Sequence, residues 1–276
     1  MTIDQFLEEI IKVFRKSGIF NPENEAQILA CHILSCDKTY LYLHRNEYID
    51  EKILLGSAAL INERCKGRPL AYIIGTANFY GYDITVDERV LIPRPETELL
   101  AEAALKEAQT IENPRILDLC TGSGCISVVL ADKLPNADIT ASDLSLRALQ
   151  IARYNGKSYP NINFVRSDLF EKIEGEFDVI VTNPPYVAER DRDGIQREVK
   201  DFEPEMALFS GYDGLDLIKK IIKEAPLHLK KGGLLLLEHS EDQSGEIRRL
   251  AEADFYEIAT IRDLAGSDRY LRARKI

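Results

Sequence analysis

The sequence lacks several features that mark whole classes of protein. Its five cysteines are odd in number and none stands in a C-x-x-C pair, which favours reduced thiols over a disulfide framework or a zinc site. The four histidines are scattered without the spacing of metal ligands, so we expect no metal. No apolar run approaches the roughly 20 residues of a membrane span, and the acidic, amphipathic N-terminus is unlike a signal peptide. These absences predict a soluble, cytoplasmic protein with no membrane partner.

The sequence also has fewer basic than acidic side chains. Among the 276 residues, 46 acidic side chains stand against 35 lysines and arginines, which gives a formal net charge of −11. Proteins that hold duplex nucleic acid normally need a basic face, so we expect no direct contact with nucleic acid. Internal repeats and low-complexity tracts are absent as well. We expect a monomer with an ordinary globular composition.

The N-terminal part of the chain, residues 1–75, has the pattern of a small helical domain. A capping box at residues 2–5 opens a helix with apolar side chains at helical spacing. Asn21 followed by Pro22 predicts the N-cap and the first position of a second helix. A third helix is predicted at 50–64, so this part is expected to form a helical bundle.

A change of pattern follows at residues 76–95. Residues 83–86 alternate polar and apolar, and 89–92 follow after a short turn, which predicts a β-hairpin that links two domains. Over 96–276, strands alternate with helices of about 10–15 residues, which predicts a parallel, doubly wound α/β sheet. The expected strands are 116–119, 137–141, 162–165, 177–181, 233–238, 257–262 and 269–274, and the expected helices are 123–134, 145–155, 214–229 and 243–253.

Four consecutive residues stand out at the end of one predicted strand: Asn183, Pro184, Pro185 and Tyr186. Neither proline has an N–H, so the strand cannot continue, and the residue before a proline is held extended. In open α/β sheets, ligands bind at the carboxyl ends of the strands. An amide side chain fixed there and followed by an aromatic ring can hold a small planar group.

A glycine-rich turn follows the first strand of the predicted sheet. Gly122 and Gly124 allow backbone N–H groups to approach a ligand closely where a helix begins. Asp143 lies 19 residues beyond Gly124, about the distance at which a carboxylate takes ribose hydroxyls. Taken singly, the glycines fit a plain tight turn and Asp143 fits a helix N-cap. Together they favour a nucleoside cofactor.

The turn departs from the dinucleotide fingerprint in two ways. It has no third glycine, and Asp118 within the strand has no place in that fingerprint. A carboxylate buried there must be paired or hydrogen-bonded. Both facts favour S-adenosylmethionine, whose amine is a cation that acidic residues hold, over a pyrophosphate cofactor. Asp168, after the third strand, stands where an adenine amino group would fall, although a loop or cap carboxylate fits it equally well.

The Asn-Pro-Pro-Tyr box resembles the signature of S-adenosylmethionine-dependent methyltransferases that act on planar nitrogen, which include adenine N6 and glutamine N5 enzymes. Such a nitrogen is a poor nucleophile because its lone pair is delocalised. The Asn183 oxygen and the Pro184 carbonyl can accept both of its N–H bonds and so direct the lone pair at the methyl group, while Tyr186 can stack on the planar group. The box alone leaves the choice between the two nitrogens open.

Further segments favour glutamine. Residues 68–75, 79–81 and 90–98 resemble the HemK/PrmC family, the glutamine N5-methyltransferases of peptide chain release factors, and Pro-Arg-Pro-Glu-Thr-Glu at 93–98 is the most specific run. The resemblance covers nearly the whole chain. It implies a Rossmann-like class I S-adenosylmethionine-dependent methyltransferase sheet, a small N-terminal helical domain that docks the substrate, and a linking β-hairpin. The implied substrate is the glutamine of the Gly-Gly-Gln loop in a class I peptide chain release factor.

The resemblance also implies roles for individual residues. Asn183, Pro184 and Tyr186 are expected to be catalytic, and Arg94 to close over the site. Cys120 departs from the family pattern, which usually has glycine there, and Glu238 begins a less typical run after the fifth strand. Cofactor-binding residues are expected at Asp118, Cys120, Thr121, Gly122, Gly124, Asp143, Leu144, Asp168, Leu169 and Asn183. Substrate-binding residues are expected at Asn183, Pro184, Pro185, Tyr186, Arg94 and Glu96, the last two of which also fit the charged first turn of a helix.

Two other interpretations compete with this one. An adenine N6-methyltransferase shares the box, but it needs a wide basic groove around a flipped base, and the net charge of −11 opposes that. A binding module that has lost its activity is expected to show a broken box or a broken glycine turn, and both are intact in this sequence.

Overall fold

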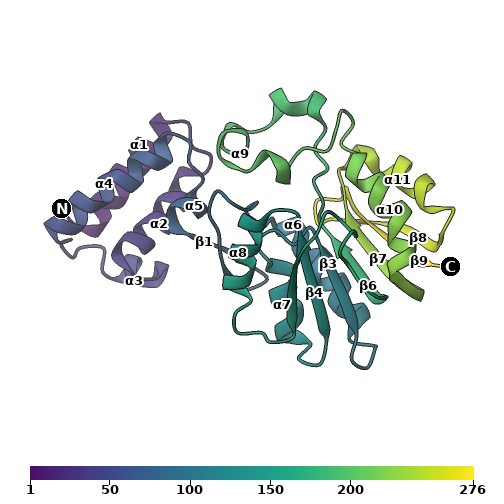
Figure 1. Cartoon of the computed structure of the whole chain (residues 1–276). Helices are drawn as coiled ribbons and strands as arrows, with labels where there is room; N and C mark the ends of the chain where they lie inside the picture. Colours follow the sequence, from purple (N-terminus) through teal and green to yellow (C-terminus); the bar gives the residue numbers. More distant parts are fainter. The chain divides into compact units, whose positions relative to one another are not determined.

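The computed structural model describes residues 1–276, which separate into two compact units (Figure 1). The first unit contains Met1–Gly75 together with Gln196–Phe202, and the second contains Thr76–Ile195 and Glu203–Ile276. A short segment from the second half of the chain therefore belongs to the N-terminal unit, which the sequence pattern did not indicate. None of the helices combines the length and apolar character that crossing a membrane requires.

The first unit is a bundle of helices around a small apolar core. The capping box at Thr2 is formed, and Phe6, Ile10 and Phe14 of the first helix are buried against Leu29 of the second. Three helices were predicted, and the structure adds three short ones, α3, α5 and α9. The helices are α1 (Ile3–Lys16), α2 (Pro22–Leu34), α3 (Lys38–Leu43), α4 (Glu51–Cys65), α5 (Leu70–Ile74) and α9 (Arg197–Phe202).

One detail of the helix starts differs from the prediction. Pro22 is the first residue of α2, but Asn21 adopts a left-handed conformation with φ of 51°, and its side chain makes no capping hydrogen bond. An extended backbone is what turns a capping side chain toward the free N–H groups, so the left-handed Asn21 is unable to serve as that cap.

A buried ion pair fixes α9 to the bundle of the first unit. The Arg64 side chain on α4 is 5% exposed, and its Nη2 lies 2.9 Å from Glu25 Oε1 and 3.0 Å from Glu198 Oε2. Glu25 belongs to α2 and Glu198 to α9, so one guanidinium holds three helices together. Removing one partner of such a pair is strongly destabilising because the other charge stays buried.

The second unit begins with a hairpin of β1 (Thr76–Phe79) and β2 (Tyr82–Thr85). The prediction that 83–86 pair with 89–92 was wrong, because the turn lies earlier in the chain. Tyr80 and Gly81 have φ of 53° and 83°, and two positive φ values are what a two-residue hairpin turn needs. Asn155 then binds the hairpin to the sheet domain, since its side chain exchanges two 3.0 Å hydrogen bonds with the Thr85 backbone.

The predicted α/β sheet is confirmed. Seven strands lie in the order β5-β4-β3-β6-β7-β9-β8; the first five are parallel, while β9 runs antiparallel between β7 and β8. The short connection from 263 to 267 leaves no room for a crossover helix, so β9 has to reverse direction. The strands are β3 (Arg115–Leu119), β4 (Asp138–Asp143), β5 (Ile162–Arg166), β6 (Phe177–Thr182), β7 (Leu229–Glu238), β8 (Phe255–Arg262) and β9 (Asp268–Lys275).

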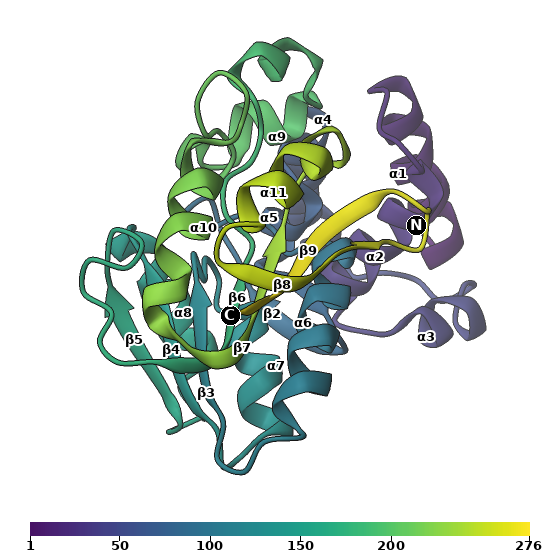
Figure 2. The ribbon, with the colours of Figure 1, turned by 90° about the vertical axis from the view of Figure 1, so that its right-hand side faces the viewer.

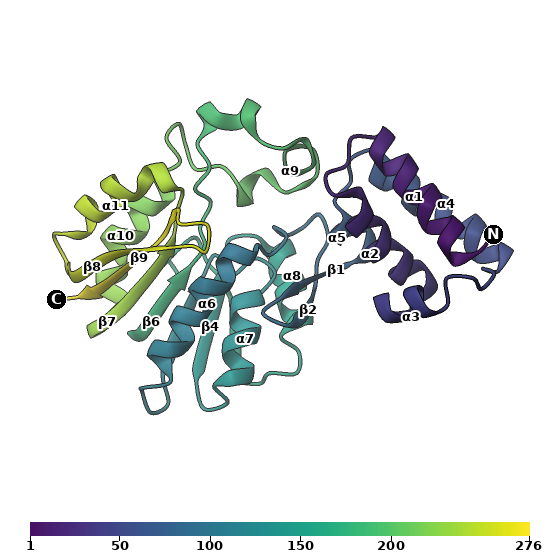
Figure 3. The same cartoon turned by 180° about the vertical axis from the view of Figure 1, so that it is seen from behind.

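Helices cover both faces of this sheet (Figures 2 and 3). One face carries α10 and α11, whose apolar side chains form a single core with β3, β6, β7 and β9. The other face carries α6, α7 and α8, which pack against one another in sequence. The helices are α6 (Pro95–Ala108), α7 (Cys125–Lys133), α8 (Leu146–Asn155), α10 (Asp216–His228) and α11 (Ser244–Ala251), with short 3₁₀ turns η1 (Glu189–Gly194), η2 (Glu205–Ala207) and η3 (Glu241–Gln243).

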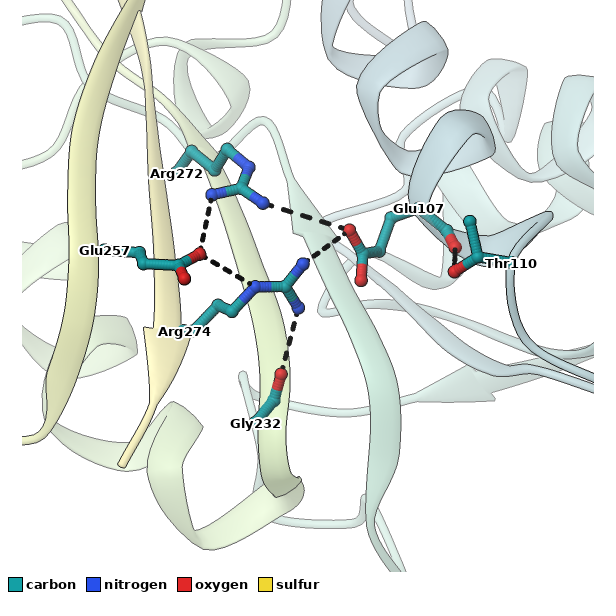
Figure 4. A network of polar contacts seen from close by, with 6 residues as sticks. All are labelled: Glu107, Thr110, Gly232, Glu257, Arg272 and Arg274. Atoms are coloured by element: carbon teal, nitrogen blue, oxygen red, sulfur yellow. Dashed lines mark hydrogen bonds and ion pairs between the residues drawn. The ribbon is translucent and has the colours of Figure 1, made fainter.

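An ionic network connects β9 to its neighbours (Figure 4). Arg274 donates to Glu107 of α6 at 2.8 Å and to Glu257 of β8 at 3.1 Å, and it also donates to the Gly232 carbonyl at 3.0 Å. Arg272 lies within 4.0 Å of the same two carboxylates. Because the charges share partners, the network holds the antiparallel strand in register better than an isolated surface pair would.

Candidate active site

A cavity lies at the carboxyl ends of the parallel strands of the second unit, where open α/β sheets bind ligands. Its wall combines the turn after β3, the ends of β4, β5 and β6, the segment before α6, and η2. Of the residues predicted from sequence, the lining includes Cys120, Thr121, Gly122, Asp143, Leu144, Asp168, Leu169, Asn183, Pro185 and Arg94. Asp118, Gly124, Pro184, Tyr186 and Glu96 are not part of the lining.

The glycine turn owes its shape to three positive φ angles. Cys120, Gly122 and Gly124 have φ of 62°, 55° and 79°. A Cβ on Gly124 would lie 3.1 Å from the Cβ of Ala152, so this glycine lets α7 start close against α8. Cys120 is the only one of the three with a side chain, and a left-handed conformation costs such a residue about 1–2 kcal/mol. Burial raises the pKa of the Cys120 thiol above its usual range, and the nearby Asp143 charge adds to this effect.

Asp118 lies underneath the turn, with 1% exposure. Its Oδ2 accepts hydrogen bonds from the hydroxyls of Thr121 and Ser127, both at 2.6 Å, and from the Ser127 N–H at 3.2 Å. Its Oδ1 is buried without a partner. Burial raises the pKa of Asp118 to about 6 against the lowering effect of these hydrogen bonds. The carboxylate thus organises the turn and keeps one acceptor atom unused.

Asp143, at the end of β4, holds the turn from its other side. Its Oδ2 accepts the Gly122 N–H at 2.9 Å, and its Oδ1 accepts the Ser145 N–H at 2.8 Å. The N-cap of α8 is Ser145, whose hydroxyl accepts the Ala148 N–H at 3.2 Å. Asp143 is therefore not the helix cap that was its simplest alternative role. Burial raises its pKa, and the two backbone hydrogen bonds oppose that rise.

Asn183 follows directly after β6, as the two prolines predict. Its Nδ2 donates to Thr97 Oγ1 at 3.0 Å, and the Thr97 hydroxyl donates to Glu238 Oε2 at 2.8 Å. Tyr186 donates its hydroxyl to the other oxygen, Glu238 Oε1, at 3.2 Å. Burial and the Glu238 carboxylate raise the pKa of Tyr186, so its hydroxyl keeps its proton.

Thr97 and Glu238 were missed as site residues in the sequence. Thr97 stands in the run at 93–98 and Glu238 in the less typical run after β7, but 141 positions separate them and neither belongs to a recognisable pair. Glu238 is 1% exposed, and burial raises its pKa to about 7. Gln243 was missed too: its Nε2 donates to the Tyr186 carbonyl at 2.9 Å and fixes the backbone of the box.

The structure places Arg94 at the cavity and Glu96 on the exposed surface of α6. Arg94 lines the cavity, and its Nη2 donates to the buried Glu203 Oε1 at 2.5 Å, while Glu203 Oε2 accepts the Ile92 N–H at 3.2 Å. This pair joins the segment before α6 to the segment before η2. Glu96 is exposed in the first turn of α6, where its charge suits the positive end of the helix dipole.

Comparison with known proteins agrees with this architecture. The chain matches the family model of the methyltransferase small domain over residues 95–200 and that of the PrmC N-terminal domain over residues 5–75. Among solved structures, a methyltransferase from Pyrococcus furiosus has a TM-score of 0.52 at 20% identity and covers 80% of this chain and 98% of its own. The 16S rRNA N2 G1207 methyltransferase of Thermus thermophilus, solved with AdoMet and guanosine, has a TM-score of 0.53 at 19% identity, with coverages of 73% and 50%. The fold is that of a class I methyltransferase.

Relatives with curated names narrow the class to a family. A protein of Rhodopirellula baltica is 37% identical over 99% of this chain and 96% of its own length, and one of Koribacter versatilis is 39% identical over 100% and 99%. One from Deinococcus radiodurans is 34% identical over 100% and 99%. All three are named release factor glutamine methyltransferase. This chain belongs to the family of release factor glutamine methyltransferases.

Proposed function

We propose that this protein transfers a methyl group from S-adenosylmethionine to the side-chain amide N5 of the glutamine in the Gly-Gly-Gln motif of class I peptide chain release factors. The observation that carries the proposal is the hydrogen bond from Asn183 Nδ2 to Thr97 Oγ1. It commits the amide nitrogen to the protein, so that Asn183 Oδ1 is the atom left to accept an N–H from a substrate. An acceptor at this position suits a primary amide.

The residues around the glycine turn fit S-adenosylmethionine. This cofactor supplies a methyl group on a positively charged sulfonium, together with an amine, a ribose and an adenine. The carboxylates of Asp143 and Asp168 line the cavity and suit its hydroxyls and amino groups, and the orphaned Asp118 Oδ1 leaves an acceptor below the turn. Gly122 carries no Cβ at the wall, so its backbone can lie close to a ligand. Cys120, Thr121, Gly124, Leu144 and Leu169 complete the proposed set.

The Asn-Pro-Pro-Tyr box would hold the amide of the substrate. Asn183 Oδ1 and the Pro184 carbonyl accept its two N–H bonds, which turns the nitrogen lone pair toward the methyl group and stabilises the positive charge that develops on nitrogen. Transfer would break the bond between the methyl carbon and the sulfonium sulfur, leaving the neutral thioether S-adenosylhomocysteine, and the methylated nitrogen would lose one proton to solvent. A general base before attack is unnecessary, so positioning does most of the catalysis. Pro185 and Tyr186 flank the planar group, while Arg94 and Glu96 belong to the segment that closes over the substrate.

The N-terminal unit would serve as the docking domain for the release factor, with 76–95 as the link and 96–276 as the methyltransferase domain. The family names identify the partner class, and a protein that modifies translation factors is expected to work in the cytoplasm. We infer a monomer that recognises the release factor itself and has no direct contact with nucleic acid, in keeping with the net charge of −11.

Labelled S-adenosylmethionine tests the proposal. The protein is incubated with a class I release factor, with the same factor carrying Gln→Ala in its Gly-Gly-Gln loop, and with DNA that contains adenine. Label on the intact factor alone is the expected result. Label on DNA and none on the factor would establish the adenine N6 alternative, and equal label on both factors would place the methylated residue outside the Gly-Gly-Gln loop.

A further inference from the structure

We infer that Thr97 and Glu238 are positioning residues that fix the orientation of both functional side chains of the Asn-Pro-Pro-Tyr box. The inference rests on the proposed function and deepens it. Glu238 ends β7, Thr97 lies in the first turn of α6, and Asn183 and Tyr186 follow β6. Thr97 and Glu238 are 2% and 1% exposed. The four side chains form one connected set of hydrogen bonds, in which Thr97 and Glu238 are buried while Asn183 and Tyr186 are half-buried.

The direction of each hydrogen bond in this set follows from the carboxylate. An ionised carboxylate only accepts, so the hydroxyls of Thr97 and Tyr186 must both donate to Glu238. The Thr97 hydroxyl has a single proton, which is then committed, so Thr97 Oγ1 can only accept from Asn183. The amide of Asn183 therefore places its nitrogen toward Thr97 and its oxygen away from it. The Glu238 carboxylate, as the final acceptor, therefore sets the donor and acceptor of every hydrogen bond in this set.

The opposite orientation of the Asn183 amide is penalised by the same logic. It would place Oδ1 against Thr97 Oγ1, two acceptors with no proton between them in a buried place, and an unsatisfied buried polar group costs about 1–3 kcal/mol. It would also present N–H donors to the substrate amide, so one of the two substrate N–H groups would lose its acceptor and only the Pro184 carbonyl would remain. The buried pair thus selects the orientation of Asn183 that can bind an amide and orient its nitrogen.

Two variants at Thr97 separate this role from packing. Thr97→Val keeps the shape but removes the hydroxyl, whereas Thr97→Ser keeps the hydroxyl and removes the methyl group. We expect Thr97→Val to lower the kcat of release factor methylation roughly 10- to 100-fold with little change in the Kd for S-adenosylmethionine. We expect Thr97→Ser to retain most of the activity. If both variants lose activity equally, or if Thr97→Val matches the unaltered protein, the inference is overturned.

A second readout is independent of the substrate. In ¹⁵N-labelled protein the side-chain N–H signals of Asn183, identified by their loss in Asn183→Asp, are expected to exchange slowly with solvent because one proton is bound to Thr97. Slow exchange should persist in Thr97→Ser and disappear in Thr97→Val. Fast exchange in the unaltered protein overturns the positioning role whatever the substrate. Slow exchange without methylation of a release factor leaves the positioning role in place and counts against the proposed function alone.

Discussion

The backbone N–H of Gly122 donates to Asp143 Oδ2 over 2.9 Å, and this bond joins the turn after β3 to the end of β4. The second carboxylate oxygen accepts the Ser145 N–H, so Asp143 fixes the start of α8 as well. One side chain thus holds two sides of the cavity wall in place. These two hydrogen bonds restrain the turn, and a restrained turn needs less ordering when a ligand binds.

Replacing Asp143 with alanine should weaken cofactor binding. The variant leaves the N–H groups of Gly122 and Ser145 without their acceptor and removes a carboxylate from the cavity wall. The loss of one or two such bonds corresponds to a roughly 10- to 100-fold higher Kd for S-adenosylmethionine, which isothermal titration calorimetry measures directly. Asp138→Ala is the control because Asp138 lies at the exposed opposite end of the same strand. An equal effect of both substitutions would contradict a local role for Asp143.

Replacing Asn183 with alanine should act on turnover and spare the cofactor. The variant removes Oδ1, the acceptor for the substrate amide, while the glycine turn keeps its contacts. We expect kcat to fall at least about 100-fold, with a change in cofactor Kd of less than about threefold. Asn78→Ala, at an exposed position of β1, is the control. A parallel loss of kcat and cofactor affinity would make Asn183 mainly a cofactor ligand.

Features set by adjacent residues could be predicted from the sequence, whereas contacts between distant residues could not. The end of β6 could be predicted because Pro184 and Pro185 prevent a strand from continuing, and the glycine turn because its residues are adjacent. The predicted hairpin lay a few residues too late in the chain, because tyrosine rarely adopts a positive φ and Tyr80 therefore gave no sign of the turn. Contacts between distant parts of the chain left no local signal.

The candidate site shows the same division. Asn183 and Asp143 were found from motifs, and the structure brings both to one cavity. Thr97 and Glu238 meet across 141 positions, so no spacing rule applies to them. Asp118 was expected at the cofactor, and the structure places it below the turn, where Thr121 and Ser127 hold one oxygen and leave Oδ1 without a partner; its contact with the cofactor stays a prediction.

Cys120 stands at a left-handed position, and glycine there should stabilise the protein. At φ of 62° a side chain destabilises the folded state by about 1–2 kcal/mol, and glycine avoids this strain. Glycine also makes the unfolded chain more flexible, which offsets roughly 0.5–1 kcal/mol of that gain. We expect Cys120→Gly to leave the free energy of unfolding equal or about 1 kcal/mol higher. The same change at Cys65, within the last turn of α4, should lower it by about 1 kcal/mol. Denaturant unfolding of both variants measures this contrast, and an equal loss of stability in both would contradict a cost of the left-handed backbone at Cys120.

The buried carboxyl of Glu238 should make stability depend on pH. Burial raises its pKa from the ordinary 4.5 to about 7, and the charge of Glu96 adds to the rise, while Arg269 and the hydroxyls of Thr97 and Tyr186 oppose it. The folded state therefore binds a proton more tightly than the unfolded chain. The stabilisation that protonated Glu238 gives the folded state is fully present below pH about 4.5 and is lost as pH rises through about 7. The free energy of unfolding changes by about 3 kcal/mol in total.

Glu238→Gln removes this titration and is the variant that tests it. Between pH 4.5 and 8, the stability of the unaltered protein relative to Glu238→Gln should fall by up to about 3 kcal/mol. Glu171→Gln, at an exposed position, is the matched control. Methylation should change in the opposite direction, because only the ionised carboxylate is a pure acceptor for Thr97 and Tyr186. The kcat of the unaltered protein is expected to rise through pH about 7, and that rise should be absent in Glu238→Gln. A difference in unfolding free energy that stays constant with pH would show that folding does not raise the pKa of Glu238, and the rise in kcat would then belong to another group.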